Sequence, residues 1–202
     1  MLEELAQDIL DIGLNAASAE AGRIAIRVTE DTSADRLSIL VADNGKGMSE
    51  DLRKRVLNGF ATTKTGHSKP VGLGIALLRQ AADLCGGRFR LCSREGQGTL
   101  VAVSMVRSHI DRPPMGDLAA SIMALCSTEH GMEVRFEHRC DDRSFIFDSA
   151  EILERKNGIV SAPELMGIDD LLQEKERNLL EEAHRVGCQG PPPGRDAARQ
   201  GR

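Results

Sequence analysis

Three polar residues near the start of the chain have the types and spacing to bind a metal ion and a base. Asp11 and Asn15 are four residues apart, so on a helix both side chains project from one face. An amide oxygen is a hard neutral ligand suited to Mg²⁺, and a carboxylate one turn earlier can orient a water molecule as a general base. Asp43 ends an apolar run and can accept a hydrogen bond from the amine of adenine, where guanine presents a carbonyl. The Asp11–Asn15 pair also fits the solvated face of an amphipathic helix.

Glycine-rich segments follow at three places. Gly45 and Gly47, in Asp43-Asn44-Gly45-Lys46-Gly47-Met48, allow the backbone to come close to a base and sugar, although Asp-Asn-Gly is also a common turn sequence. Gly72-Leu73-Gly74 opens a predicted helix, whose free N–H groups would form an anion site. Gly96-Gln97-Gly98-Thr99 equally fits a plain hairpin turn. The chain contains neither a P-loop motif nor a dinucleotide fingerprint.

These boxes, in this order, resemble the ATP-binding domain shared by gyrase, the large heat-shock chaperones, histidine kinases and mismatch-repair proteins (the GHKL superfamily). The resemblance covers roughly residues 5–105. It implies the Bergerat fold, with ATP and Mg²⁺ as cofactors and residues 58–71 as an ATP lid. The roles it implies are a metal ligand at Asn15, a general base at Asp11, adenine recognition at Asp43 and Thr99, and further nucleotide contacts at Gly45, Gly47, Met48, Thr63, Lys64, Gly72, Leu73 and Gly74. Lys64 fits a solvated loop lysine equally well.

Departures from the family pattern narrow the expected activity. ATPases of the family usually carry Glu where this chain has Asp11, and the shorter side chain predicts weak hydrolysis. Ser18 replaces an Asp that is typical of the mismatch-repair branch. The first box begins near residue 5, which leaves no room before it for the phosphoacceptor region of a histidine kinase. We therefore expect a kinase-like protein that transfers phosphate to a partner protein. An ATP-dependent switch or weak ATPase, and a non-catalytic nucleotide sensor, are the alternatives.

Composition excludes several other classes. The 202 residues are 41% hydrophobic and 28% charged, typical of a globular protein. Only 2% are aromatic and the net charge is −5, both of which argue against a nucleic-acid partner. No run of 18 apolar residues is present, and we expect no membrane span and no signal peptide. Five cysteines without a regular framework suggest reduced thiols and a cytoplasmic location, and a homodimer is possible.

Hydrophobic periodicity predicts the elements that position the boxes. Residues 1–107 should form a helix at 5–19, strands at 23–29 and 36–42, helices at 49–57 and 72–84, and a hairpin at 88–106. This order predicts a two-layer α/β sandwich with a mixed, mostly antiparallel sheet. Residues 108–186 should form a small α+β region docked on it, with helices at 117–126 and 168–184 and a hairpin at 133–148. Residues 187–202 should be disordered.

Two features of the C-terminal region allow further interpretations. Cys126, His130, His138 and Cys140 include the ligand types of a zinc site, but their spacing is unusual and favours plain structural residues. The leucines of the 168–184 helix favour packing on its own domain over binding a partner helix.

Overall fold

The chain folds around one mixed sheet. The computed structural model describes residues 4–58, 73–128, 131–152 and 161–187, and within them the elements are α1 (Leu5–Ser18), β1 (Arg23–Asp31), β2 (Arg36–Asp43), α2 (Glu50–Leu57), α3 (Leu73–Leu84), β3 (Arg88–Ser93), β4 (Thr99–Val106), α4 (Leu118–Cys126), β5 (Glu133–Cys140), β6 (Arg143–Asp148), α5 (Ser149–Ile152) and α6 (Ala162–Gly187). The expected lid at 58–71 and tail at 187–202 lie almost wholly outside the described residues.

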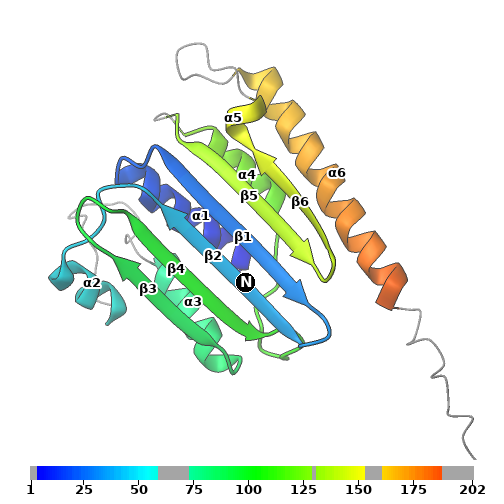
Figure 1. Ribbon diagram of the computed structural model, residues 1–202, viewed down its shortest axis with the longest axis horizontal. Helices are drawn as coiled ribbons and strands as arrows, with labels where there is room; N and C mark the ends of the chain where they lie inside the picture. The colour runs from blue at the N-terminus through cyan, green and yellow to red at the C-terminus, as the bar shows by residue number, and fades with distance from the viewer. Residues whose placement is uncertain (1–3, 59–72, 129–130, 153–160, 188–202) are drawn as a thin grey trace, which may run out of the picture.

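The sheet has six strands in the order β3-β4-β2-β1-β5-β6. All neighbouring pairs are antiparallel except β1 and β5, which run parallel. Helices α1, α3 and α4 lie side by side against one face of the sheet, and the opposite face is free of helices (Figure 1). The predicted α/β sandwich with a mostly antiparallel sheet is therefore confirmed.

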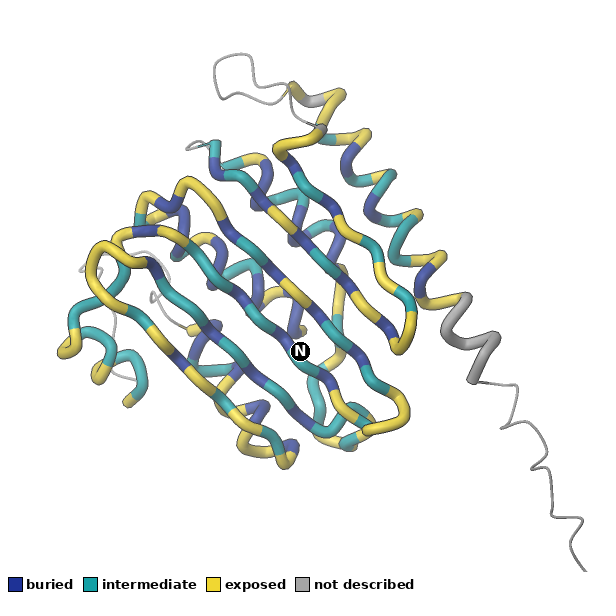
Figure 2. The backbone as a smooth tube through the Cα atoms, viewed as in Figure 1, coloured by how far each residue is buried: buried dark blue, intermediate teal, exposed yellow. Residues whose placement is uncertain are grey.

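Alternating side chains direct one face of each strand into the core. Along β1, Ile24, Ile26 and Val28 are buried while the residues between them are more exposed, and this alternation recurs in β2 and β4 (Figure 2). A strand with one buried face has its register strongly specified, because a shift by one residue would expose every core side chain. The core thereby fixes which residues of neighbouring strands lie opposite each other.

The first helix packs on this core through Leu5, Ile9, Ile12 and Ala16, as its spacing predicted. These four residues form one stripe of α1, and burial of such an aliphatic side chain contributes roughly 1.5–3 kcal/mol for Leu and Ile. The opposite stripe is therefore free to face the space in front of the sheet. Asp11 and Asn15, which belong to that stripe, are half-buried.

The C-terminal region joins the same sheet. We expected a small α+β region docked on the main domain, and the structure shows that its hairpin extends the sheet directly. Strand β5 pairs with β1 along its length, from Arg23 opposite Glu133 to Glu30 opposite Cys140. Residues of α4, β5 and α6 also belong to the hydrophobic cluster that contains α1 and β1. The division at residue 107 remains a sequence prediction, and the two parts share one core.

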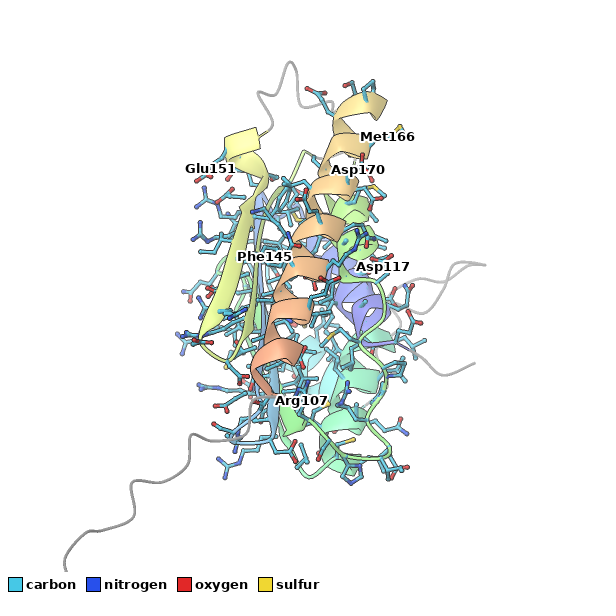
Figure 3. All side chains as sticks on the ribbon, turned by 90° about the vertical axis from the view of Figure 1, so that its right-hand side faces the viewer. Arg107, Asp117, Phe145, Glu151, Met166 and Asp170 are labelled. Atoms are coloured by element: carbon cyan, nitrogen blue, oxygen red, sulfur yellow. The ribbon has the colours of Figure 1, made fainter. Side chains whose placement is uncertain are left out.

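A buried charged cluster attaches α6 to this extension. His138 on β5 is 1% exposed, and its Nδ1 lies 2.9 Å from both carboxylate oxygens of Glu176 on α6. Its Nε2 lies 3.5 Å from a carboxylate oxygen of Glu30 on β1, and the other Glu30 oxygen accepts a hydrogen bond of 2.6 Å from Arg107. Figure 3 shows α6 lying along this side of the molecule, beside Phe145 of β6.

Charge partners dominate the titration of this cluster. Burial alone lowers the pKa of His138, but Glu176 and Glu30 outweigh it and raise the pKa to about 9. The hydrogen-bonded His138 and Arg107 lower the pKa of Glu30 to about 2, against the opposing effect of burial. His138 is therefore an imidazolium at neutral pH, held between two carboxylates.

Candidate nucleotide-binding site

Three strands present polar side chains side by side at one end of the sheet. Asp43, the last residue of β2, pairs with Thr99, the first of β4, and Thr99 pairs with Ser93, the last of β3. Alternation places all three on the same face as the buried Val41, Val101 and Leu91, which is the face that the helices cover. They line an open cavity of about 770 Å³, together with Met48 and residues of α2 and the β3–β4 turn.

Asp43 is held in a defined orientation. Its Oδ1 accepts a hydrogen bond of 2.8 Å from the Gly45 backbone N–H. Burial raises the pKa of Asp43, and backbone N–H groups of Gly45 and Thr99 oppose that rise. A carboxylate oriented by backbone donors at the wall of a cavity can accept a hydrogen bond from a ligand amine, which is the role the sequence predicts for Asp43.

Close backbone approach explains two of the glycines. A Cβ atom at Gly98 would lie 2.0 Å from the Asp43 carbonyl oxygen, and one at Gly47 would lie 2.0 Å from the Arg94 carbonyl oxygen. Both residues also have positive φ, at 81° and 65°. The second and fourth boxes therefore pack directly against each other, and neither position accepts a side chain without displacing backbone.

The C-terminus of α1 meets the second box. The Lys46 backbone N–H donates to the Ala19 carbonyl at 2.9 Å, and Ala19 also lies against Gly45. Asn15, one turn earlier on α1, is thereby carried to the edge of the same region. The structure brings the Asn15 and Asp43 boxes together, as the order of the motifs predicted.

The start of α3 packs against the other end of this polar stripe. A Cβ atom at Gly74 would lie 2.7 Å from the Asp8 carbonyl oxygen and 2.9 Å from Asp11 Cβ. Gly74 is buried and Leu73, the first residue of α3, is 44% exposed. Asp11 itself accepts a hydrogen bond of 3.3 Å from Gln7. The described part of the third box therefore adjoins Asp11, and its free helix N-terminus lies beside the predicted metal and base residues.

Three predicted site residues, Thr63, Lys64 and Gly72, lie outside the described residues. So does His130, one of the four residues considered for zinc. Within the described ranges, no three His, Cys, Asp or Glu side chains are grouped so that they could hold a metal ion. His138 pairs with carboxylates instead, consistent with its interpretation as a structural residue.

Ser93 was missed by the sequence reasoning. Its hydroxyl accepts a hydrogen bond from the Met48 backbone N–H at 2.9 Å, donates one to the Gly98 carbonyl at 2.9 Å, and lies 3.0 Å from the Thr99 hydroxyl. It therefore joins the second and fourth boxes. The available signal was alternation, since Ser93 lies two residues after the core residue Leu91 and just before the turn.

Comparison with known proteins agrees with this geometry. The family model of the histidine kinase-, DNA gyrase B- and HSP90-like ATPase matches residues 1–109. The chain belongs to this family. Its domain is a histidine kinase-like ATPase domain, which supports ATP binding and kinase-like function in general. No described helix of this domain or of the C-terminal region has the length and apolar character needed to cross a membrane.

Among curated relatives of the ATPase domain are two sensor kinases of Escherichia coli (strain K12). Sensor histidine kinase ZraS is 29% identical over 114 residues, which are 56% of this chain and 24% of the relative. Signal transduction histidine-protein kinase AtoS is 35% identical over 97 residues, which are 48% of this chain and 16% of the relative. The chain thus matches about a quarter or less of the length of these kinases.

Solved structures with similarity to this chain include full-length ShkA in complex with AMPPNP, at 24% identity and a TM-score of 0.36, covering 50% of this chain and 21% of that one. The N-terminal domain of a DNA repair protein covers 82% of this chain and 56% of that one, at 14% identity and a TM-score of 0.49.

Proposed function

We propose that the chain binds Mg-ATP in the cavity at the end of the sheet and transfers the terminal phosphoryl group to a partner protein. The observation that carries the first half is the register of Asp43 with Thr99 on the cavity wall. The oriented Asp43 carboxylate accepts the exocyclic amine of adenine, and its loss in a bound complex would leave that amine without a partner. Guanine presents a carbonyl at the same place and is disfavoured.

The triphosphate extends from the base toward the start of α3. Gly74 packs on α1 beside Asp11, so phosphates at this helix N-terminus lie within reach of the stripe that carries Asp11 and Asn15. Asn15 supplies a neutral oxygen ligand to Mg²⁺, which in proteins is commonly held by few side chains together with phosphate oxygens and water. When bound, the metal ion neutralises charge on the phosphates. Asp11 is the base for any hydrolysis, and Gln7 orients its carboxylate.

Transfer to a partner protein is supported by the kinases among the relatives of this domain. The decisive experiment incubates the chain with γ-³²P-ATP and Mg²⁺, alone and with proteins co-purified from its native cell. Label on a second protein supports phosphotransfer, and release of free phosphate alone supports an ATPase. The matched control is Asp43→Asn, which should lose both signals because it cannot accept the adenine amine.

A second candidate is an ATP-dependent switch without phosphotransfer. The observation in its favour is that β1 lies directly between β2, which carries Asp43, and β5, which begins the C-terminal extension of the sheet. A nucleotide-dependent change at β2 therefore has a continuous sheet through which to reach α6. ATP binding with neither label transfer nor phosphate release would favour a nucleotide sensor.

A further inference from the structure

The Ser93 hydroxyl is the point at which three parts of the cavity wall meet. It contacts the Met48 N–H, the Gly98 carbonyl and the Thr99 hydroxyl at 2.9, 2.9 and 3.0 Å. A serine hydroxyl has one proton and two lone pairs, so three partners use its whole hydrogen-bonding capacity. No surplus remains, and the direction of one of these bonds decides the direction of another.

We infer, on the basis of the proposed function, that Ser93 is a positioning residue that determines base specificity by setting the direction of the Thr99 hydroxyl. The Met48 N–H is always the donor, which leaves Ser93 one proton to give and one lone pair to offer. Those two must be shared between the Gly98 carbonyl, which only accepts, and the Thr99 hydroxyl, which does either.

Two proton arrangements satisfy these contacts. In the first, Ser93 donates to Gly98 and Thr99 donates to Ser93, so Thr99 offers only lone pairs to the cavity. In the second, Ser93 donates to Thr99, and the Thr99 proton is free to point into the cavity. Both Ser93 and Thr99 line that cavity, so either arrangement is presented to a bound base.

Adenine distinguishes the two arrangements. Its amine is flanked by two bare ring nitrogens, N1 and N7, which only accept hydrogen bonds. With the amine on Asp43, the neighbouring Thr99 faces one of these nitrogens, directly or through a water molecule, and must donate. Bound adenine therefore selects the arrangement in which Ser93 donates to Thr99. Guanine carries N1–H at this edge, which suits the opposite arrangement.

A purely structural role for Ser93 predicts something different. If the hydroxyl only ties Met48 to the β3–β4 turn, its removal loosens the wall and weakens every nucleotide equally. If it directs the Thr99 proton, its removal erases the advantage of a ligand that has the ring nitrogen over one that lacks it. The ratio of two affinities separates the roles, because a general loosening cancels from it.

The test measures dissociation constants for ADP, 1-deaza-ADP and 7-deaza-ADP by calorimetry with Mg²⁺. The full chain is compared with Ser93→Ala, with Ser93→Thr, which keeps the hydroxyl, and with Cys92→Ala, an exposed neighbour on the opposite face of the same strand. We expect the natural chain to bind one deaza analogue about tenfold more weakly than ADP, the usual effect of one neutral hydrogen bond. Ser93→Ala should bind ADP about tenfold more weakly and treat the analogues alike within twofold. Ser93→Thr and Cys92→Ala should keep the discrimination.

Equal binding of all three nucleotides by the natural chain would overturn the role of Ser93, as would tenfold discrimination that survives in Ser93→Ala. Failure of the natural chain to bind ADP at all would instead contradict the proposed function itself. Circular dichroism reports whether each variant folds. If Ser93→Ala does not fold, Ser93→Cys takes its place under the same criteria, because a thiol keeps the shape and is only a weak donor and acceptor.

Discussion

Raising the pH above neutrality should destabilise this protein through His138. The pKa of His138 is raised from 6.5 to about 9 in the folded chain. A group with a raised folded pKa contributes its full stabilisation below its unfolded pKa and loses it as the pH rises through the folded value. The contribution is therefore complete below pH 6.5 and lost progressively up to about pH 9.

The magnitude follows from that shift. A change of one pKa unit corresponds to ~1.4 kcal/mol, so the free energy of unfolding should fall by about 3 kcal/mol across this range. The lowered pKa of Glu30 reflects the same interaction seen from the carboxylate and is not added. The groups that face His138 are Glu176 from α6 and Glu30 from β1, with Arg107 on the far side of Glu30.

Urea denaturation at pH 6.5, 7.5, 8.5 and 9.0, compared with His138→Gln, measures the effect. The variant should be less stable at pH 6.5, because it leaves two carboxylates without their cation, and its stability should change little with pH in this range. Burial also raises the pKa of Cys85 and Cys140, so the series stops at pH 9.0 and only the difference between the two proteins is used. Parallel curves for the natural chain and His138→Gln would refute the charged state of His138.

Three further predictions concern the cavity. Asp43→Asn should abolish the preference for ADP over GTP in calorimetry, and equal binding of GTP by the natural chain would remove the base assignment. Asp11→Asn should leave nucleotide affinity within about twofold while abolishing phosphate release, whereas Asn15→Ala should weaken Mg²⁺-dependent binding, and equal loss in both variants would make Asp11 a structural residue. Gly98→Ala should lower the free energy of unfolding by roughly 2–4 kcal/mol, because its Cβ meets the Asp43 carbonyl. Gly96→Ala, with positive φ but open space around its Cβ, should cost only about 1–2 kcal/mol, and equal losses would refute the steric argument.

Local patterns were sufficient for the layered fold and for the strand-end position of Asp43. Alternation in β1 and β2 and the N-cap at Ser49, whose hydroxyl accepts a hydrogen bond from the Leu52 N–H, are encoded within a few residues of each other. Such signals depend on period and on local hydrogen bonds, which a single sequence displays directly. The same patterns predicted the hairpins of the C-terminal region.

Contacts between distant segments could not be read in this way. The parallel pairing of β1 with β5 joins residues 110 positions apart, as in Arg23 and Glu133. His138 invited comparison with nearby cysteines and histidines, but its partners Glu30 and Glu176 lie on other elements. Ser93 has meaning only once the register places it beside Thr99. In each case the function of the side chain is set by strand order, which hydrophobic period does not determine.

The position of the His138 cluster separates the two candidate functions. Asp43 pairs with Ile24 near the start of β1, whereas Glu30 lies six residues further along that strand, so the cluster and the base site are roughly 20 Å apart. Glu176→Gln weakens the attachment of α6 and touches no residue of the cavity. If the chain is a kinase whose sheet is a rigid support, ADP affinity in this variant should stay within twofold of the natural chain, measured by calorimetry at pH 7. A change of fivefold or more would mean that α6 and the nucleotide are coupled by about 1 kcal/mol, which is the property of a switch.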